Sequence, residues 1–167
     1  MRYYPVLLDI RGKRCVVFGG GKVAERKVGN LLHCGAKVKV ISPRLTDRLS
    51  KMAKGRRIEY LEGEYRPGLI EGAFLVFAAT SSRKANARIG REAKRLGVPV
   101  NVCDSAGEST FILPAVLRKR GLTIGVSTGG VSPARSVEVR NTLKRLIEEG
   151  CLSKGKRYQL KKRESST

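Results

Sequence analysis

The sequence is informative first through what it lacks. It has no apolar run of about eighteen residues, so we expect no membrane-spanning helix. Residues 1–14 also lack the apolar stretch and small-residue cleavage site of a secretory signal. We therefore expect the protein in the cytoplasm.

Paired metal-ligand residues are missing as well. The four cysteines (Cys15, Cys34, Cys103 and Cys151) contain no C-x-x-C pair, and in a reducing compartment they are expected to be small buried hydrophobic residues. The only histidine, His33, lies near the expected end of a helix, where a cation is favourable. This set disfavours a structural zinc site, and we predict no resident metal.

Acidic residues are few. Fourteen Asp and Glu stand against 35 Lys and Arg, which gives a net charge of +21. Such a charge attracts polyanions, either nucleic acid or a small ligand that bears carboxylates or phosphates. Aromatic residues make up only 5% and are not interleaved with the basic ones, so nucleic-acid binding by stacking is disfavoured. The densest basic cluster lies in residues 151–167, which we interpret as a solvated C-terminal tail.

What the sequence does contain is an alternation of strands and helices. Short apolar runs typical of buried strands occur at 14–18, 37–41, 57–61, 73–79 and 99–103, and helical spacing of apolar residues occurs at 22–35, 43–54 and 82–97. Strands that alternate with helices predict right-handed crossovers and a mainly parallel sheet. We predict a Rossmann-like, doubly wound α/β domain over residues 1–112.

The pattern changes in residues 113–150. Two apolar runs joined at "RKRG" predict an antiparallel hairpin, and a helix is expected from Ser132 (N-cap) and Pro133 (first turn) to Gly150. Such a segment buries little by itself, so it must dock on the first domain or on a second copy of the chain. We predict a homodimer. The apolar residues expected to be covered are Val116, Leu122, Ile124, Val126, Leu143 and Ile147.

The glycines in "VVFGGGKVAERK" fit the dinucleotide-binding pattern G-x-G-x-x-A with Gly19, Gly21 and Ala24. Gly19 would permit the tight turn, Gly21 would let a pyrophosphate approach the backbone, and Ala24 would let the helix pack closely on the strand. Amides at the helix N-terminus would then face the phosphates. We therefore predict that a dinucleotide binds here.

The acidic residue that usually binds the ribose hydroxyls after the second strand is missing. Its place is taken by Ser42, Pro43 and Arg44. Ser42 offers one hydrogen bond, and Arg44 would suit a 2′-phosphate. These residues leave the choice between NAD and NADP open.

Three longer stretches, "VVFGGGKVAERK", "LVFAATSSRKAN" and "NVCDSAGESTFILPA", resemble the siroheme-synthase family of precorrin-2 dehydrogenases, some of which are also sirohydrochlorin ferrochelatases. The resemblance covers roughly residues 3–150. It implies NAD-dependent oxidation of precorrin-2, a homodimer built through the C-terminal part, and an active site between the two halves. It also implies NAD contacts at Lys22, Val23, Pro43, Arg44 and Thr80. No methyltransferase segment is present in this sequence, so only the late steps are expected.

Asp104 is the residue to which we assign the chemistry. It follows the apolar strand at 99–103 and should lie at the carboxyl end of the sheet, where doubly wound folds bind ligands. The family resemblance places a key aspartate at the same position. Loss of a proton during precorrin-2 oxidation would require one positioned base. If the protein also inserts iron, Asp104 would accept the pyrrole N–H protons.

The polycarboxylate substrate that the resemblance implies would explain the positive charge without nucleic acid. Candidate carboxylate contacts are the hairpin tip (Arg118, Lys119 and Arg120) and the loop at 127–135. Two alternatives stay open: a nucleotide-sensing regulatory module, which uses the same fold, and a basic nucleic-acid-binding protein.

Overall fold

A computed structural model describes residues 2–119 and 121–149. The chain divides into two compact units, which meet in the sequence between Ile112 and Leu113. We call them unit 1 and unit 2. The predicted hairpin residue Arg120, the predicted helix end Gly150, and the basic tail with Cys151 lie outside the described residues.

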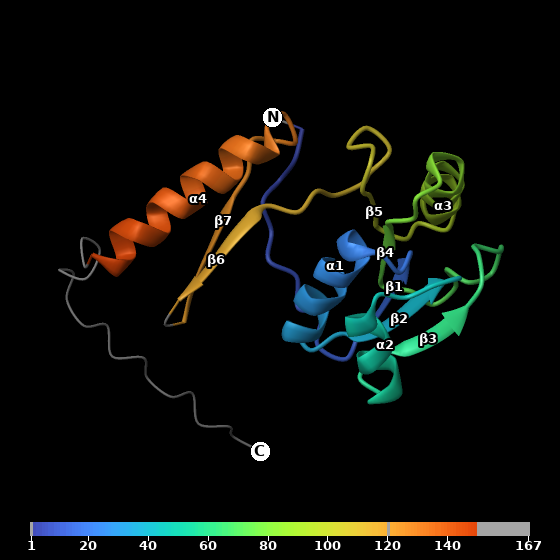
Figure 1. Ribbon diagram of the computed structural model, residues 1–167. Helices are drawn as coiled ribbons and strands as arrows, with labels where there is room; N and C mark the ends of the chain where they lie inside the picture. Colours follow the sequence, from blue (N-terminus) through green and yellow to red (C-terminus); the bar gives the residue numbers. More distant parts are fainter. Residues whose placement is uncertain (1, 120, 150–167) are drawn as a thin grey trace, which may run out of the picture. The chain divides into compact units, whose positions relative to one another are not determined.

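Unit 1 is built on a five-stranded, all-parallel sheet (Figure 1). The strand order is β3-β2-β1-β4-β5, so the chain moves outward from β1 in one direction and then crosses back to the other side. The strands are β1 (Arg14–Phe18), β2 (Lys37–Ser42), β3 (Glu59–Glu62), β4 (Leu75–Ala78) and β5 (Val100–Val102). The predicted Rossmann-like α/β fold is confirmed.

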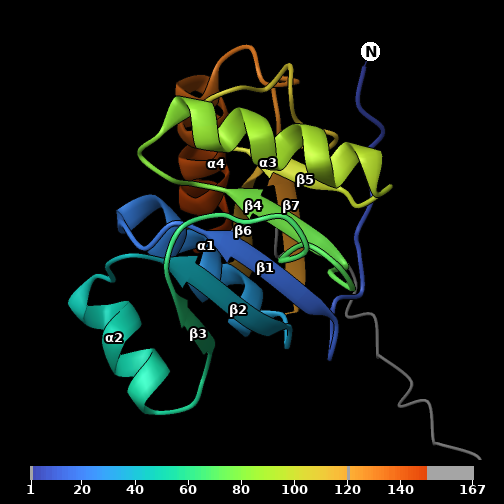
Figure 2. The same cartoon turned by 90° about the vertical axis from the view of Figure 1, so that its right-hand side faces the viewer.

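Both faces of this sheet are covered by helices. Alternate residues of β1 point to opposite faces, with Cys15 and Val17 in one buried cluster and Val16 and Phe18 in the other. The first cluster contains apolar residues of α1 (Lys22–His33) and α2 (Asp47–Lys54), and the second contains residues of α3 (Arg83–Arg95). Figure 2 shows the three helices on these two faces. The central strands β1 and β4 and the strand β5 are therefore buried on both sides, which explains their apolar sequences, whereas the edge strand β3 is largely exposed.

The start of α2 differs from the sequence prediction, which placed the helix at 43–54. The helix begins at Asp47, because Thr46 is its N-cap and its side-chain oxygen accepts from the Leu49 amide at 3.3 Å. Residues 43–45 instead form a loop, in which the Arg44 carbonyl accepts from the Ser42 hydroxyl at 2.8 Å.

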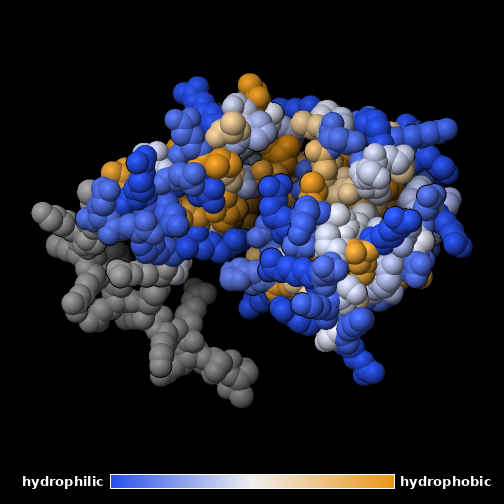
Figure 3. Space-filling model, viewed as in Figure 1, coloured by the Kyte–Doolittle hydropathy of each residue, from blue (hydrophilic) through white to orange (hydrophobic). Residues whose placement is uncertain are grey.

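Unit 2 contains an antiparallel hairpin and one long helix. The strands β6 (Ala115–Lys119) and β7 (Leu122–Val126) pair with Leu117 opposite Ile124, and α4 (Pro133–Glu148) packs against both strands. Ser132 caps α4 by accepting from the Arg135 amide at 3.3 Å, as predicted. On the face seen in Figure 3, apolar residues are exposed over this region among hydrophilic ones.

The helical spacing predicts that Val137, Leu143, Leu146 and Ile147 form the apolar side of the last helix, but the structure buries them to different extents. Leu143 and Ile147 are half-buried, whereas Val137 and Leu146 are 42% and 38% exposed. Within the described part of the chain, no helix has the length and apolar character needed to cross a bilayer.

Candidate active site

The predicted cofactor-binding and catalytic residues all lie in unit 1, in or beside loops that follow the carboxyl ends of strands. Gly19 and Gly21 follow β1, Ser42 ends β2, Thr80 follows β4, and Asp104 follows β5. Because these strands are parallel, their carboxyl ends share one edge of the sheet. Lys22 and Val23 open α1, and Pro43 and Arg44 lie in the loop after β2.

The glycine loop is packed against two neighbouring loops. Gly19 has φ +114°, which side chains rarely tolerate, and a Cβ there would collide with the Ala79 carbonyl oxygen. A Cβ at Gly20 would collide with the Arg44 carbonyl oxygen and come within 2.8 Å of the Ser42 hydroxyl. The Thr46 amide donates to the Gly20 carbonyl at 2.9 Å. Two of the three glycines are therefore required by the packing of the protein itself.

Gly21 differs from the other two glycines. It is the N-cap of α1, and a Cβ built there would meet nothing within 4 Å. The first amides of a helix have no partner inside the helix and carry a partial positive charge, so open space at this point suits an anionic group. The Val23 side chain is 46% exposed beside it. This arrangement fits the pyrophosphate of a dinucleotide.

The loop after β2 is held in place by hydrogen bonds of Ser42. Ser42 is 6% exposed, its hydroxyl donates to the Arg44 carbonyl, and its own carbonyl accepts from the Tyr60 hydroxyl at 2.9 Å. The Ser42 proton is therefore used inside the protein, while Pro43 and Arg44 are exposed. The groups that this loop presents outward are thus those of Pro43 and Arg44.

A carboxylate on α1 holds the start of α2. Glu25, whose side chain is 12% exposed, accepts from the Thr46 hydroxyl at 2.6 Å and lies 3.8 Å from Arg48 and 4.0 Å from Lys22. These partners offset the negative charge of Glu25 near the anion-binding end of α1.

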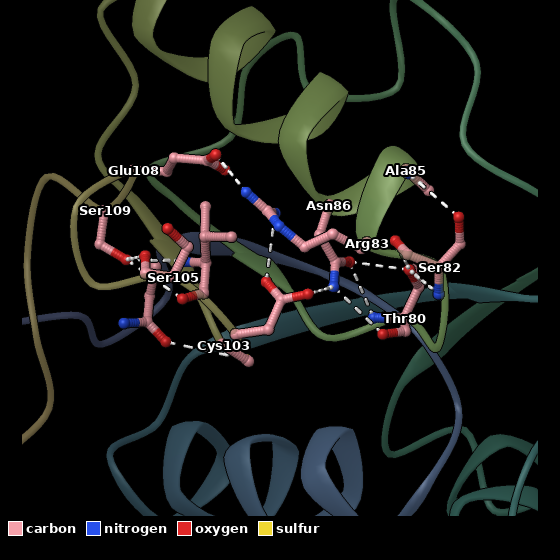
Figure 4. A network of polar contacts seen from close by, with 12 residues as sticks. Thr80, Ser82, Arg83, Ala85, Asn86, Cys103, Ser105, Glu108 and Ser109 are labelled. Carbon is pink, nitrogen blue, oxygen red and sulfur yellow. Dashed lines mark hydrogen bonds and ion pairs between the residues drawn. The ribbon is translucent and has the colours of Figure 1, made fainter.

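Asp104 belongs to a hydrogen-bonded network between the loops after β4 and β5. Figure 4 shows this network around Asn86, Arg83 and Thr80. Asp104 Oδ2 accepts from Asn86 Nδ2 at 2.9 Å, and Oδ1 lies 3.4 Å from an Arg83 guanidinium nitrogen. Asn86 in turn contacts Thr80 through its amide, and Arg83 also pairs with Glu108. The network therefore connects the predicted cofactor contact Thr80 with the predicted catalytic residue Asp104.

A buried lysine lies below this network. Lys27 on α1 is 7% exposed, its ammonium donates to Asn101 Oδ1 at 2.8 Å, and it lies 5.3 Å from the centre of the Phe77 ring. Burial lowers the pKa of Lys27, while the nearby Cys103 side chain opposes that shift. Burial also raises the pKa of the Cys103 thiol, and Lys27 opposes it. Asn101, two residues before Asp104, is thus anchored to α1.

The predicted carboxylate contacts lie in unit 2. Arg118 is exposed, Lys119 pairs with Glu148 at 3.6 Å, and the loop at 127–135 is held by the Thr128 hydroxyl, which donates to the Ser132 carbonyl at 2.9 Å. In the described ranges, no three His, Cys, Asp or Glu side chains gather as a metal site.

Sequence reasoning missed Gly20, Asn86 and Arg83. Gly20 stands in the variable position of the G-x-G pattern. Glycine is required there because a side chain would collide with the Arg44 carbonyl, and sequence spacing does not predict where that carbonyl lies. A signal for Asn86 was available: it is a polar residue on the buried side of α3, together with Ile89, Gly90 and Ala93.

The chain is similar to proteins of known name. Siroheme synthase from Chromobacterium violaceum is 37% identical over 150 residues, which cover 90% of this chain and 32% of that protein. Siroheme synthase from Methylobacillus flagellatus is 37% identical over 147 residues, with 88% and 32% covered. The chain therefore spans about a third of the length of these curated relatives.

The solved structure of SirC, a precorrin-2 dehydrogenase, has the same fold. Its TM-score is 0.73 at 22% identity, and the match covers 86% of this chain and 70% of that one.

Residues 6–115 match the family described as "Putative NAD(P)-binding". The matched range contains the glycine loop, the loop after β2, Thr80 and Asp104, which are parts of the candidate site. The chain belongs to this NAD(P)-binding family.

Proposed function

We propose that this protein is an NAD-dependent dehydrogenase that oxidises precorrin-2 to sirohydrochlorin in siroheme biosynthesis. The observation that carries the proposal is the position of Asp104, which is linked through Asn86 to Thr80, in the same unit as a glycine loop that fits a pyrophosphate. The names and identities of the relatives supply the substrate class.

The cofactor would be held by α1 and the loops around it. The amides of Lys22 and Val23 at the start of α1 would bind the pyrophosphate, and the exposed Pro43 and Arg44 would border the adenosine ribose. Thr80, after β4, would border the nicotinamide half. NAD, when bound, accepts a hydride from the tetrapyrrole.

Asp104 would take the proton that leaves the substrate together with the hydride. Its Oδ2 is occupied by Asn86, whereas Oδ1 has only the longer contact with Arg83, and the side chain is 38% exposed. We therefore assign proton acceptance to Oδ1. Proton transfer to a positioned side chain contributes about 10²–10⁴-fold to a rate.

The excess of basic residues would serve the substrate. A net charge of +21 creates a positive field that attracts a polycarboxylate macrocycle. Contacts from Arg118, Lys119, Arg120 and the loop at 127–135 stay predictions, and each would bind a carboxylate by charge-assisted hydrogen bonds.

We further propose a homodimer formed through unit 2. Val139 and Leu146 are seven residues apart on α4, hence on the same side of the helix, and they are 41% and 38% exposed. Leu122 on β7 is 48% exposed. A symmetric pairing that covers these residues would remove apolar surface from water.

The activity is tested by incubating the purified protein with precorrin-2 and NAD while the absorbance of the macrocycle and the formation of NADH are followed. We expect turnover by the wild type and a loss of two to four powers of ten in kcat for Asp104→Ala. Asp47→Ala, which removes an exposed aspartate from α2, is the matched control and should retain turnover.

Three other outcomes would contradict the proposal in different ways. Tight NAD binding without turnover would favour a nucleotide-sensing module. Turnover that survives in Asp104→Ala, with unchanged thermal stability, would remove Asp104 from the chemistry. Binding of nucleic acid with no affinity for NAD would favour a basic nucleic-acid-binding protein.

Iron insertion is a separate prediction from the resemblance. It is tested by adding sirohydrochlorin with ferrous or cobalt ion and following the metallated product, again with Asp104→Ala. Chelation that requires Asp104 would support a second activity, and absence of chelation would restrict the protein to dehydrogenation.

A further inference from the structure

We propose that Asn86 is the positioning residue that aims Asp104 for proton transfer. It would reserve one carboxylate oxygen as a hydrogen-bond acceptor and leave the other for the substrate. This inference rests on the proposed function, since it assumes that Asp104 takes the proton. The contacts that carry it lie within unit 1 and are visible around Asn86 and Thr80 in Figure 4.

Asn86 makes a complete set of contacts although it is only 1% exposed. Its Oδ1 accepts from the Thr80 amide at 3.0 Å and from the Thr80 hydroxyl at 2.7 Å. Its Nδ2 donates to the Thr80 carbonyl at 3.1 Å and to Asp104 Oδ2 at 2.9 Å. A buried amide with all its groups paired is held in one orientation.

That orientation is set by the backbone of Thr80. A main-chain N–H can only donate, so it must face Oδ1, and a main-chain carbonyl can only accept, so it must face Nδ2. If the amide turned over, its oxygen would lie against the Thr80 carbonyl and the Asp104 carboxylate. The donor side of Asn86 therefore faces Asp104 by necessity, and the loop after β4 fixes the carboxylate after β5.

The other charged groups near Asp104 hold it less firmly. Arg83 lies 3.4 Å from Oδ1 and is shared with Glu108, with which its contact is shorter. Cys103 is the preceding residue, and its pKa is raised mainly by burial, with Asp104 adding to the shift. Of the two side chains that bind the Asp104 carboxylate, Asn86 thus makes the closer contact.

Asn86 is not needed to start α3. Ser82 already caps that helix by accepting from the Ala85 amide at 3.2 Å. The side-chain bonds of Asn86 go instead to the loops after β4 and β5. A role in aiming Asp104 therefore makes predictions that a role in helix capping does not.

The first test uses Asn86→Asp, which keeps the shape but replaces the donor by an acceptor. In the cofactor-free protein, the ¹³C carboxyl signal of Asp104, assigned by its loss in Asp104→Asn, should titrate at higher pH than in the wild type, because two carboxylates in contact disfavour each other's ionisation. Asn30→Asp, on the exposed surface of α1, is the matched control and should leave that titration unchanged. An unaltered titration in Asn86→Asp would overturn the proposal.

The second test is a double-mutant cycle on turnover. Asn86→Ala should lower kcat by about 10–100-fold with the KM for NAD changed less than about threefold, and it should have no further effect in the Asp104→Ala background. Equal losses in both backgrounds, or a loss confined to the KM for NAD, would show that Asn86 supports only the cofactor loop and would overturn the proposal. If Asn86→Ala fails to fold, Asn86→Ser enters the same cycle.

The two proposals fail in different ways. If the wild type does not oxidise precorrin-2, the proposed function fails, while the carboxyl titration still decides whether Asn86 controls Asp104. If the wild type is active and Asp104→Ala is not, an additive cycle refutes the role of Asn86 alone.

Discussion

Unit 1 and unit 2 use similar elements but bury them to different extents. The strands β1, β4 and β5 of unit 1 are buried almost throughout, with Val16, Val17 and Val76 fully inaccessible. Within the described residues of unit 2, Leu117 is the one hydrophobic side chain in the buried class. The comparison teaches that unit 1 has a core of its own, whereas unit 2 has one helix against a two-stranded sheet and needs a further surface.

The division matches the kind of work assigned to each unit. A dinucleotide site depends on fixed backbone geometry, and the glycine loop follows β1, whose side chains lie in both buried clusters. A surface that associates with another subunit requires exposed apolar groups. The four predictions that follow compare the units, from the largest expected change in stability to the smallest.

Phe77→Ala should cause the largest loss. The Phe77 ring is 1% exposed, lies 5.5 Å from the Phe111 ring in an edge-to-face arrangement, and has the Lys27 ammonium 5.3 Å from its centre. Removing it should lower the free energy of unfolding by about 3–5 kcal/mol. Phe74→Ala, at a ring that is 36% exposed just before β4, should cost much less. Urea unfolding measures both, and equal losses would contradict a core centred on the buried strands.

Gly20→Ala should cause the second largest loss of unfolding free energy, roughly 2 kcal/mol or more, because the new Cβ would collide with the Arg44 backbone carbonyl.

Gly21→Asp should leave stability within about 0.5 kcal/mol, yet it should abolish NAD binding because a carboxylate would occupy the pyrophosphate position. Gly29→Asp, at an open position on α1, controls for the added charge. Calorimetric titration with NAD and with NADP measures affinity. Unchanged binding in Gly21→Asp would move the cofactor away from this loop.

The sequence was sufficient for the parts of the fold that local pattern determines. Apolar runs located β1, β4 and β5 because these strands are buried on both faces. The stretch "GGG" after a strand located the turn because Gly19 needs a positive φ. The start of α2 was misplaced because Pro43 is typical of a first helical turn. The structure instead places the cap at Thr46, where the side chain bonds the Leu49 amide.

The parts that sequence could not supply depend on residues brought together by the fold. The need for glycine at position 20 arises from the Arg44 carbonyl in the loop after the next strand. Asn86 gains its role from Thr80 on one side and Asp104 on the other. Asp104 was identified from its place after a strand, but its partners were not, because helical spacing alone does not say which loop a polar residue meets.

A smaller effect on stability is expected at Lys27, a buried cation whose ammonium donates to the Asn101 side-chain amide oxygen rather than to a carboxylate. Because burial lowers its pKa below the ordinary 10.5, the unfolded chain binds more protons between the lowered value and 10.5. The contribution of Lys27 to stability should therefore rise with pH across that window, by at most about 1.4 kcal/mol per pH unit. Below the window the cost of the buried charge is fully present.

Lys27→Met should remove this slope, so the difference in unfolding free energy between wild type and variant should grow in favour of the wild type as pH rises. Lys119→Met provides the comparison from unit 2, since Lys119 is 29% exposed and paired with Glu148. Urea unfolding at a series of alkaline pH values measures both variants. Parallel curves for wild type and Lys27→Met would show that the lysine is better solvated than its burial implies.

The smallest effect on the stability of unit 1 should come from placing a charge on α4 of unit 2, although the same substitution in the core of unit 1 would be strongly destabilising. Leu146→Asp places a charge on the exposed side of α4 that also carries Val139. In a monomer this substitution should alter the free energy of unfolding of unit 1 by no more than about 0.5 kcal/mol. In a dimer formed through this side it would bury an unpaired carboxylate, which is costly without a partner. We therefore expect sedimentation to change from twice the chain mass to 18.3 kDa, with the affinity for NAD unchanged.

Asn141→Asp adds the same charge at another exposed position of α4 and should leave the dimer intact. A wild type that sediments as a monomer would refute the dimer, and a dimer that survives Leu146→Asp would move the interface to another surface. Loss of unit 1 stability in Leu146→Asp would contradict the comparison itself, because it would mean that the two units share one core.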